Sequence, residues 1–329
     1  MKYFSCVILI MLSLQLFGQK NTMEFTIDLH LAKTPHSLYN QIVLIDERLD
    51  TATVGVVKKG VVNREVSLLP MPILSKQIQD LLQSATDGTA ADGRLILLLK
   101  NFDIYELTDF ASEKGVCYLR AWLFAETQNG YSQIAYTDSI HIIQSLDVTK
   151  GLIKTGKAML PSFILAHLQT ASCGGENYTM NNLLHLDSIL KSKIPLYAND
   201  SLKSGIYKTY HSFMQQTPDI TDFEAFFKKD KFQYLALPNK KGKYEEPAPV
   251  GNYAFVYQGH TYIMTGEGVY VAEKKDGDFY FKGKYRVSKS ESIIPYLLFG
   301  IVGAAIHINY TVRKGTAIIN YENGSFISK

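Results

Sequence analysis

The sequence predicts an α+β fold with an N-terminal mixed α/β, sandwich-like domain, a helical connector and a C-terminal β-rich domain. Behind an apolar N-terminus roughly 310 residues remain, which is more than one ordinary core accommodates. The first part mixes strand-like runs with an amphipathic run, whereas the last part consists of short strand-like runs separated by glycine turns. With 46% hydrophobic and 20% charged residues, the chain can bury substantial cores.

The N-terminus has the pattern of a secretory signal peptide. Lys2 supplies a positive charge, Val7–Phe17 is an apolar run, and Gly18-Gln19-Lys20 returns to polar character. The run is shorter than the about 20 apolar residues that span a bilayer. We therefore expect residues 1–19 to be removed and the mature chain to be periplasmic or secreted.

The first domain is expected to span residues 20–172 and to begin with strands. Short β-branched stretches predict strands at Phe25–Leu31, Gln41–Leu49, Thr53–Val57 and Arg64–Leu69. A helix opened by Pro72 follows, and its apolar residues recur every three or four positions at Ile73, Leu74, Ile78, Leu81 and Leu82. The continuous apolar run Leu95–Leu99 indicates a strand that is covered on both faces.

A long hairpin is predicted next. Val116–Ala125 and Tyr131–Ile143 flank Asn129-Gly130, a dipeptide that suits the positive φ angles of a tight turn. Alternation in the first arm places four large side chains on one face, namely Tyr118, Arg120, Trp122 and Phe124. Such a row could form a ligand platform, but a sheet face covered by a helix is the commoner arrangement.

From Asp147 the pattern becomes helical. Asp147 can cap a helix whose apolar stripe comprises Leu152, Ile153, Leu160, Ile164, Leu165 and Leu168. Pro161 is expected either to bend this helix or to begin a second one. The preceding order of strands, helix and long antiparallel strands, closed by this helix, resembles small α+β envelope domains such as the auxiliary lipoproteins of lipid-transport systems, a likeness of fold that implies no function.

The connector is expected at residues 173–204 and the C-terminal domain at 205–329. After a break at Ser172–Gly175, a short helix is predicted over Met180–Leu190. The residues Gly205-Ile206-Tyr207-Lys208-Thr209, followed by Phe213 and Pro218, then form a motif. This motif resembles one in a group of exported Bacteroidota proteins of uncharacterised function, although Gln216 stands where that group often has Asn. The resemblance implies export and nothing about chemistry.

The motif itself has a structural interpretation. Thr209 can cap a brief helix that buries Phe213, and Tyr207 is expected beside it in the core. Thr221 and Glu224 have the spacing of a capping box, which predicts a second helix over Phe223–Phe227. Two hairpins are expected downstream: Asn252–Tyr257 with His260–Thr265 across Gln258-Gly259, and Val269–Glu273 with Asp278–Lys282 across Lys275–Gly277.

Ile293–Ile306 is an uncharged apolar segment that contains two glycines. Its 14 residues are fewer than a spanning helix needs. We expect it to pack as a protein-covered element beside the Thr261–Glu273 strands. Contact with a membrane or partner, and a true transmembrane segment, are the alternatives.

Two cysteines, Cys117 and Cys173, remain after signal-peptide cleavage, too few for a disulfide-built scaffold. Cys117 alternates with apolar neighbours and is expected to be a buried small side chain; a bridge to Cys173 stays open. Cys173 precedes two glycines, and His167 or His185 could serve as its base in a thiol enzyme. Without a family signature, we expect Cys173 to be inert or bridged.

Motifs for chemistry are otherwise missing from the sequence. No zinc-protease, nucleophile-elbow or phosphate-loop pattern occurs, and His30 and His36 lack the spacing of metal ligands on one element. The sequence therefore predicts no catalytic, cofactor-binding or metal site. Four Asp-[Ser/Thr]-aliphatic triplets resemble sites that some exported Bacteroidota proteins glycosylate, at Asp50–Ala52, Asp138–Ile140, Asp187–Ile189 and Asp200–Leu202; the last, in a predicted loop, is the best candidate.

The overall charge predicts no nucleic-acid partner. The chain has 34 Lys and Arg against 31 Asp and Glu, so no global field attracts nucleic acid or an anionic membrane surface. The lysines at 228, 229, 231, 240, 241 and 243 are interpreted as a solvated face and loop. The sequence favours an exported, non-catalytic envelope module that binds a protein, lipid or glycan through its C-terminal domain. A hydrolase or thiol enzyme whose residues meet only in three dimensions is the alternative.

Overall fold

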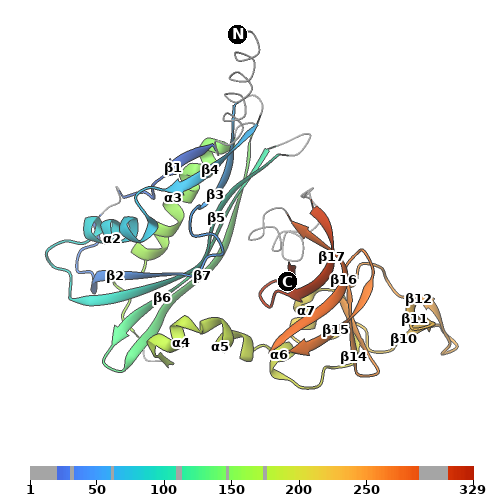
Figure 1. Ribbon diagram of the computed structural model, residues 1–329. Coiled ribbons are helices and arrows are strands. Elements are labelled where there is room, and N and C mark those ends of the chain that lie inside the picture. Colours follow the sequence, from blue (N-terminus) through green and yellow to red (C-terminus); the bar gives the residue numbers. More distant parts are fainter. Residues whose placement is uncertain are drawn as a thin grey trace, which may run out of the picture. The chain divides into compact units, whose positions relative to one another are not determined.

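A computed structural model describes residues 21–29, 33–60, 63–108, 113–145, 148–172, 176–288 and 310–329 (Figure 1). The chain divides into two compact units, Met1–Leu184 and His185–Lys329, which we call the first and second units. Their boundary falls inside the predicted connector. The predictions for the signal peptide, His30, Asp147, Cys173 and Ile293–Ile306 concern residues outside the described ranges.

The first unit contains a sheet in the order β1-β4-β3-β5-β6-β7-β8, with β2 also paired to β5. The strands are β1 (Thr22–Phe25), β2 (Tyr39–Asp46), β3 (Gly55–Lys59), β4 (Arg64–Pro70), β5 (Gly93–Thr108), β6 (Glu113–Thr127), β7 (Gly130–Ser145) and β8 (Asn177–Tyr178). The predicted strand Phe25–Leu31 was placed too late, because β1 pairs in parallel with β4 only from Thr22 to Phe25. The chain is thus α+β and rich in strand, as predicted.

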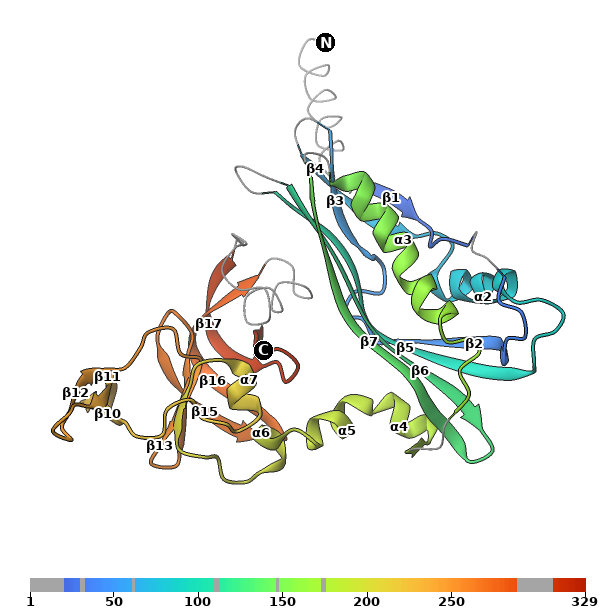
Figure 2. The same ribbon diagram turned by 180° about the vertical axis from the view of Figure 1, so that it is seen from behind.

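The long strands β5, β6 and β7 form the centre of this sheet and curve around two helices (Figure 2). The first half of β5 pairs with β2, and Gly55 of β3 lies opposite Ile104 in its second half. Leu95–Leu99 are each at most 1% exposed, which confirms the predicted strand covered on both faces.

Helices α2 (Leu74–Ala85) and α3 (Thr149–Leu165) cover one face of the sheet. Both were predicted, and α3 runs through Pro161 as one helix whose N-cap is Val148. Together they bury a core that includes Ile78, Leu81, Leu152, Leu160, Cys117, Leu119 and Leu123. The apolar residues of each helix form a single stripe along one side of it. Each helix lies with this stripe against the sheet, because the stripe is buried there.

The row Tyr118, Arg120, Trp122 and Phe124 lies on the opposite face of β6, because the alternate residues Cys117, Leu119 and Leu123 belong to the core under α2 and α3. Helices α2 and α3 therefore do not cover this row, but its four side chains are nevertheless buried. Its side chains make aromatic contacts instead: the Phe124 ring lies 5.4 Å from that of Tyr178 and the Trp122 ring 4.7 Å from that of Tyr136.

The predicted β6–β7 hairpin is confirmed, but its turn is one residue earlier than expected. Thr127 pairs with Gly130, so Gln128 and Asn129 form the turn. Gly130 has a φ of +131°, and a Cβ there would approach the Tyr178 carbonyl oxygen to 2.4 Å. Position 130 requires glycine because its φ is positive and because the Tyr178 carbonyl oxygen leaves no room for a side chain.

Short helices follow. The predicted helix Met180–Leu190 is split at His185 into α4 (Met180–Leu184) and α5 (Leu186–Ser192), and α6 (Pro195–Ala198) comes next. Because the two units divide after Leu184, α4 belongs to the first unit and α5 and α6 to the second.

The second unit is built on a seven-stranded sheet in the order β18-β17-β16-β15-β14-β13-β9. Its strands are β9 (Gly205–Tyr207), β13 (Ala254–Tyr257), β14 (His260–Met264), β15 (Val269–Lys275), β16 (Asp278–Ser288), β17 (Tyr310–Ile319) and β18 (Phe326–Ser328). Both predicted hairpins are confirmed. The turn residues Gln258 and Gly259 have φ of 50° and 79°, and Asp276 and Gly277 have 51° and 77°.

The sheet has a core on each face. One core holds Tyr207 and Phe213, whose rings lie 5.1 Å apart and are fully buried, as predicted. Thr209 caps helix α7 (Tyr210–Met214) through a capping box with Ser212, which confirms the predicted cap. Pro218 lies beyond the end of α7 at Met214, and its ring packs against Gly205.

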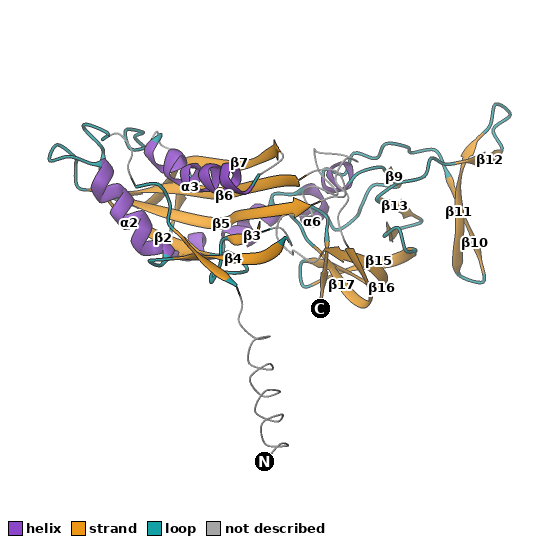
Figure 3. Ribbon diagram, turned by 90° about the horizontal axis from the view of Figure 1, so that it is seen from above, coloured by secondary structure: helices purple, strands orange, loops and turns teal. Residues whose placement is uncertain are grey.

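A small three-stranded sheet lies beside the larger one (Figure 3) and consists of β10 (Glu224–Lys228), β11 (Lys231–Pro238) and β12 (Tyr244–Pro247). Its residues contribute to the second core. The predicted helix over Phe223–Phe227 is therefore wrong. Ala225 and Leu235, paired across β10 and β11, pack with Phe255 of the larger sheet, and a strand with a bulge after Phe226 achieves this burial. The lysines around this sheet are exposed, as expected.

Candidate functional site

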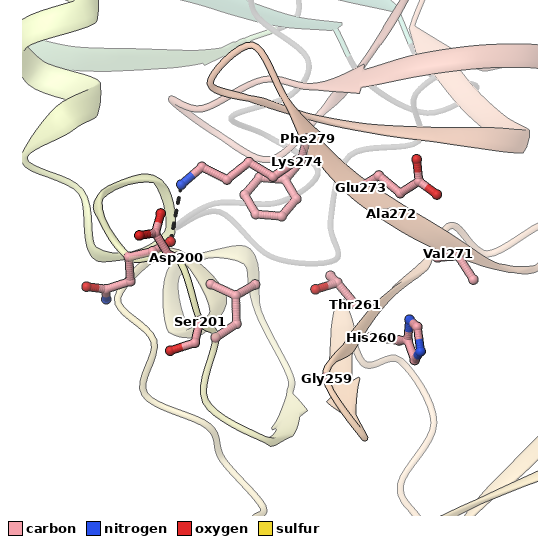
Figure 4. Close-up of a pocket in the computed structure, with 12 residues that line it drawn as sticks. Asp200, Ser201, Gly259, His260, Thr261, Val271, Ala272, Glu273, Lys274 and Phe279 are labelled. Carbon is pink, nitrogen blue, oxygen red and sulfur yellow. Dashed lines mark hydrogen bonds between the residues drawn. The ribbon is translucent and has the colours of Figure 1, made fainter.

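A hollow of about 400 Å³ lies at one end of the seven-stranded sheet in the second unit. One wall is the segment after α6, Asn199–Leu202, and the other is formed by the β13–β14 turn, the start of β14 and the middle of β15 (Figure 4). Phe279, 2% exposed, and Ala272, 5% exposed, supply apolar lining. This volume is in the range of sites for small ligands.

Lys274 holds the first wall in place. Its ammonium donates to the carbonyl oxygens of Tyr197 at 2.6 Å and Asn199 at 3.2 Å. The loop that carries Asp200 and Ser201 is thereby tied to β15. The Lys274 cation is engaged by two backbone acceptors and serves first to position the loop.

The hollow has polar groups that can hydrogen-bond a ligand. Asp200 and Ser201 stand on one wall and Thr261, only 7% exposed, on the other. Figure 4 shows the His260 ring and the Glu273 carboxylate directed away from the Ser201 side. The polar lining thus comprises one carboxylate, one amide and two hydroxyls, from Asp200, Asn199, Ser201 and Thr261. Such groups beside an apolar lining suit a ligand with several hydroxyl groups.

The arrangement lacks the contacts of a nucleophilic site. No hydrogen bond joins Ser201 or Thr261 to His260, Asp200 or Glu273 among the residues that the structure describes. Across the same residues, no group of three His, Cys, Asp or Glu could hold a metal ion. A nucleophile needs a base within hydrogen-bond reach, and the described residues of the hollow form no such pair.

Cys173, the nucleophile considered for a thiol enzyme, lies outside the described residues, so its position relative to His167 and His185 is not tested. Cys117 is fully buried, its thiol lies 3.5 Å from the Leu152 carbonyl oxygen, and burial raises its pKa to about 12. The thiol is therefore a core side chain, as expected, and not a nucleophile. The His167 ring packs against Phe163 at 5.5 Å, and His36 is exposed in a turn.

The Asp-[Ser/Thr]-aliphatic triplets fall in different structures. Asp138–Ile140 lies in β7 and Asp187–Ile189 in α5, whereas Asp50–Ala52 and Asp200–Leu202 lie in loops. The triplet that the sequence favoured is the one that forms a wall of the hollow. The other residues of the hollow gave no sequence signal, because β14, β15 and the loop meet only through the fold.

Comparison with known proteins gives no family. No protein-family profile and no curated protein matches this chain. Among solved structures, a protein from Xanthomonas campestris described under the family name DUF330 shares 9% identity at a TM-score of 0.27, covering 51% of this chain and 99% of that one. A structure described as an uncharacterized protein shares 13% at a TM-score of 0.23, covering 42% and 97%. Likenesses this weak carry no argument here.

Within the described residues, none of the helices combines the length and apolar character required to cross a bilayer.

Proposed function

We propose that the chain is an exported, non-catalytic binding protein whose second unit holds a hydroxylated ligand, such as the end of a glycan chain, in the hollow between Asn199–Leu202 and β15. The observation that carries this proposal is the set of separated polar groups, Asp200, Ser201 and Thr261, around an apolar lining. Hydroxyl and carboxylate groups recognise sugar hydroxyls, while apolar surface receives the faces of the ring.

Export rests on the N-terminal pattern of charge and apolar residues. The resemblance of Gly205–Thr209, Phe213 and Pro218 to exported Bacteroidota proteins supports the same compartment. Periplasm or cell surface is a setting in which glycans are abundant ligands. The N-terminal pattern and the motif are independent of the hollow, so export and ligand binding can fail separately.

Oligosaccharide arrays probed with the mature protein test the proposal. We expect a restricted set of saccharides to bind, and calorimetry on one of them to show at least a tenfold loss of affinity for Asp200→Ala or Thr261→Val, because each removes a ligand hydrogen bond and leaves its partner unpaired. Lys240→Ala, in the exposed β11–β12 loop, is the control and should bind normally. Binding that is equal in all variants would place the site elsewhere.

A hydrolase or thiol enzyme is the second candidate. An enzyme would be distinguished from a binding protein by a chemical change in the bound saccharide that no longer occurs with the Cys173→Ala or Ser201→Ala variant. We expect Cys173→Ala to leave binding intact, because no activating partner is indicated by its sequence context.

A further inference from the structure

The β16–β17 ribbon of the second unit has two unlike faces. Phe279, Phe281 and Tyr285 of β16 point into the core. The alternate residues Lys282, Lys284 and Arg286 therefore point outward, and all three are exposed. The three-stranded sheet packs over β9, β13 and β14 and reaches only Val269 of β15, so it leaves this outer face open.

Basic side chains gather on this outer face. They are Lys282, Lys284 and Arg286 of β16, Lys314 of β17, and Lys329, whose ammonium lies 4.8 Å from the centre of the Tyr280 ring. Two carboxylates are near: Glu267 accepts from Arg286 at 2.7 Å, and Glu273 lies opposite Tyr280. Lys282, Lys284 and Lys314 form no ion pair within the described ranges. The local charge is therefore strongly positive although the chain is nearly neutral.

Lys284 and Lys314 lie directly opposite each other in the antiparallel register. Side chains in this position are about 5 Å apart at Cβ, and like charges there destabilise a sheet. The pair of opposed lysines therefore adds no stability to the fold. Departures of this kind from local stability are expected where a surface serves binding.

Apolar side chains stand among these cations. Val312, opposite Arg286, is 46% exposed, and Ile327 of β18 is 43% exposed beside Ile318. The face is formed by neighbouring strands of one sheet. A surface that combines several lysines with exposed aliphatic groups suits the headgroup region of a bilayer.

We propose that the outer face of β16–β17, built from Lys282, Lys284, Arg286 and Lys314 with Val312 and Ile327, docks the protein on a membrane surface that carries anionic lipid headgroups. This inference goes beyond the ligand hollow and does not depend on it. The lysines supply attraction to the headgroup phosphates, and the aliphatic side chains enter the interface without spanning it.

Vesicle co-sedimentation of the mature protein tests the inference. Vesicles made of equal parts phosphatidylglycerol and phosphatidylcholine should retain the protein, vesicles of phosphatidylcholine alone should not, and added salt should release it. Neutralising one lysine near such a surface weakens binding about fivefold. The double variant Lys284→Gln/Lys314→Gln should therefore bind about 25-fold more weakly.

The matched control is Lys229→Gln/Lys231→Gln, which removes the same charge from the exposed β10–β11 turn and should change binding by less than about twofold. The double variant at 284 and 314 should melt at the same or a higher temperature, since it removes the opposed pair. Equal loss in both variants, or retention by phosphatidylcholine alone, would overturn the proposal. The proposal would also be overturned if the protein did not bind vesicles but bound soluble dextran sulfate, and if that binding depended on Lys284 and Lys314.

Discussion

Gly205 of β9 lies against the ring of Pro218 so closely that a Cβ at position 205 would be 2.3 Å from the Pro218 Cβ. The Ile220 carbonyl oxygen is 3.0 Å from the same point. The first and last residues of the Gly205–Pro218 motif thus form one contact. This contact closes the loop that contains α7 and brings Tyr207 to Phe213.

Gly205→Ala should therefore destabilise the second unit by about 1–3 kcal/mol, the usual cost of overpacking. Chemical denaturation monitored by tyrosine fluorescence measures the change. Gly315→Ala is the control, because a Cβ there meets no atom within 4 Å, and it should be neutral or slightly stabilising. A Gly205→Ala protein as stable as the parent would contradict the close contact.

The Cys117 thiol should be unreactive in the folded protein. Burial raises its pKa to about 12, so at pH 8 only roughly one thiol in ten thousand is ionised. In the mature Cys173→Ala variant, Cys117 is the remaining cysteine, and a thiol reagent should label it only after denaturant is added. Fast labelling under native conditions would show that the core of the first unit opens readily.

Alkaline pH should destabilise the second unit. Burial raises the pKa values of Tyr210 and Tyr253 above their usual value of 10.0. In the unfolded chain both ionise near pH 10, so the stability that depends on their protonated form is complete below pH 10 and is lost as the pH rises above it. Each tyrosine contributes a slope of up to about 1.4 kcal/mol per pH unit.

Urea unfolding at several pH values between neutrality and strongly alkaline solution measures this slope. Tyr210→Phe should lower stability at neutral pH by about 1 kcal/mol, because the 2.7 Å hydrogen bond to the Tyr321 carbonyl oxygen is lost, and it should flatten the alkaline slope. An unchanged slope in this variant would show that Tyr210 ionises freely in the fold.

Export makes a separate prediction. Intact-mass analysis of the protein recovered from the expressing cell's envelope or medium should show a chain that begins near Lys20, because signal peptidase is expected to cut after Gln19. A mature protein that retains Met1 or Lys2 would refute cleavage.

Sequence periodicity anticipated the elements whose neighbours lie close in the chain. The α2 stripe, the Gln258-Gly259 and Asp276-Gly277 hairpins and the Thr209 cap depend on local spacing, and each was predicted. Glu224–Lys228 was mistaken for a helix because Thr221 and Glu224 match a cap. Its strand conformation is decided by β11 and by Phe255, which are distant in the sequence.

The candidate sites could not be predicted for the same reason. The hollow joins residues 199–202 to 259–261, 271–274 and Phe279. The basic face becomes visible only once the strand register sets Lys284 against Lys314. The net charge of the whole chain is close to zero. A net charge does not show where the charged residues lie, so it gave no sign of the cations gathered on this face.

The central claim is that the second unit binds a hydroxylated ligand without changing it. The most direct test is mass spectrometry of an array-selected oligosaccharide after prolonged incubation with the mature protein and elution from it. We expect full recovery at unchanged mass, and bound amounts that fall at least tenfold for Asp200→Ala. A shortened or chemically modified oligosaccharide, absent when Ser201→Ala or Cys173→Ala is used, would contradict the claim and establish an enzyme.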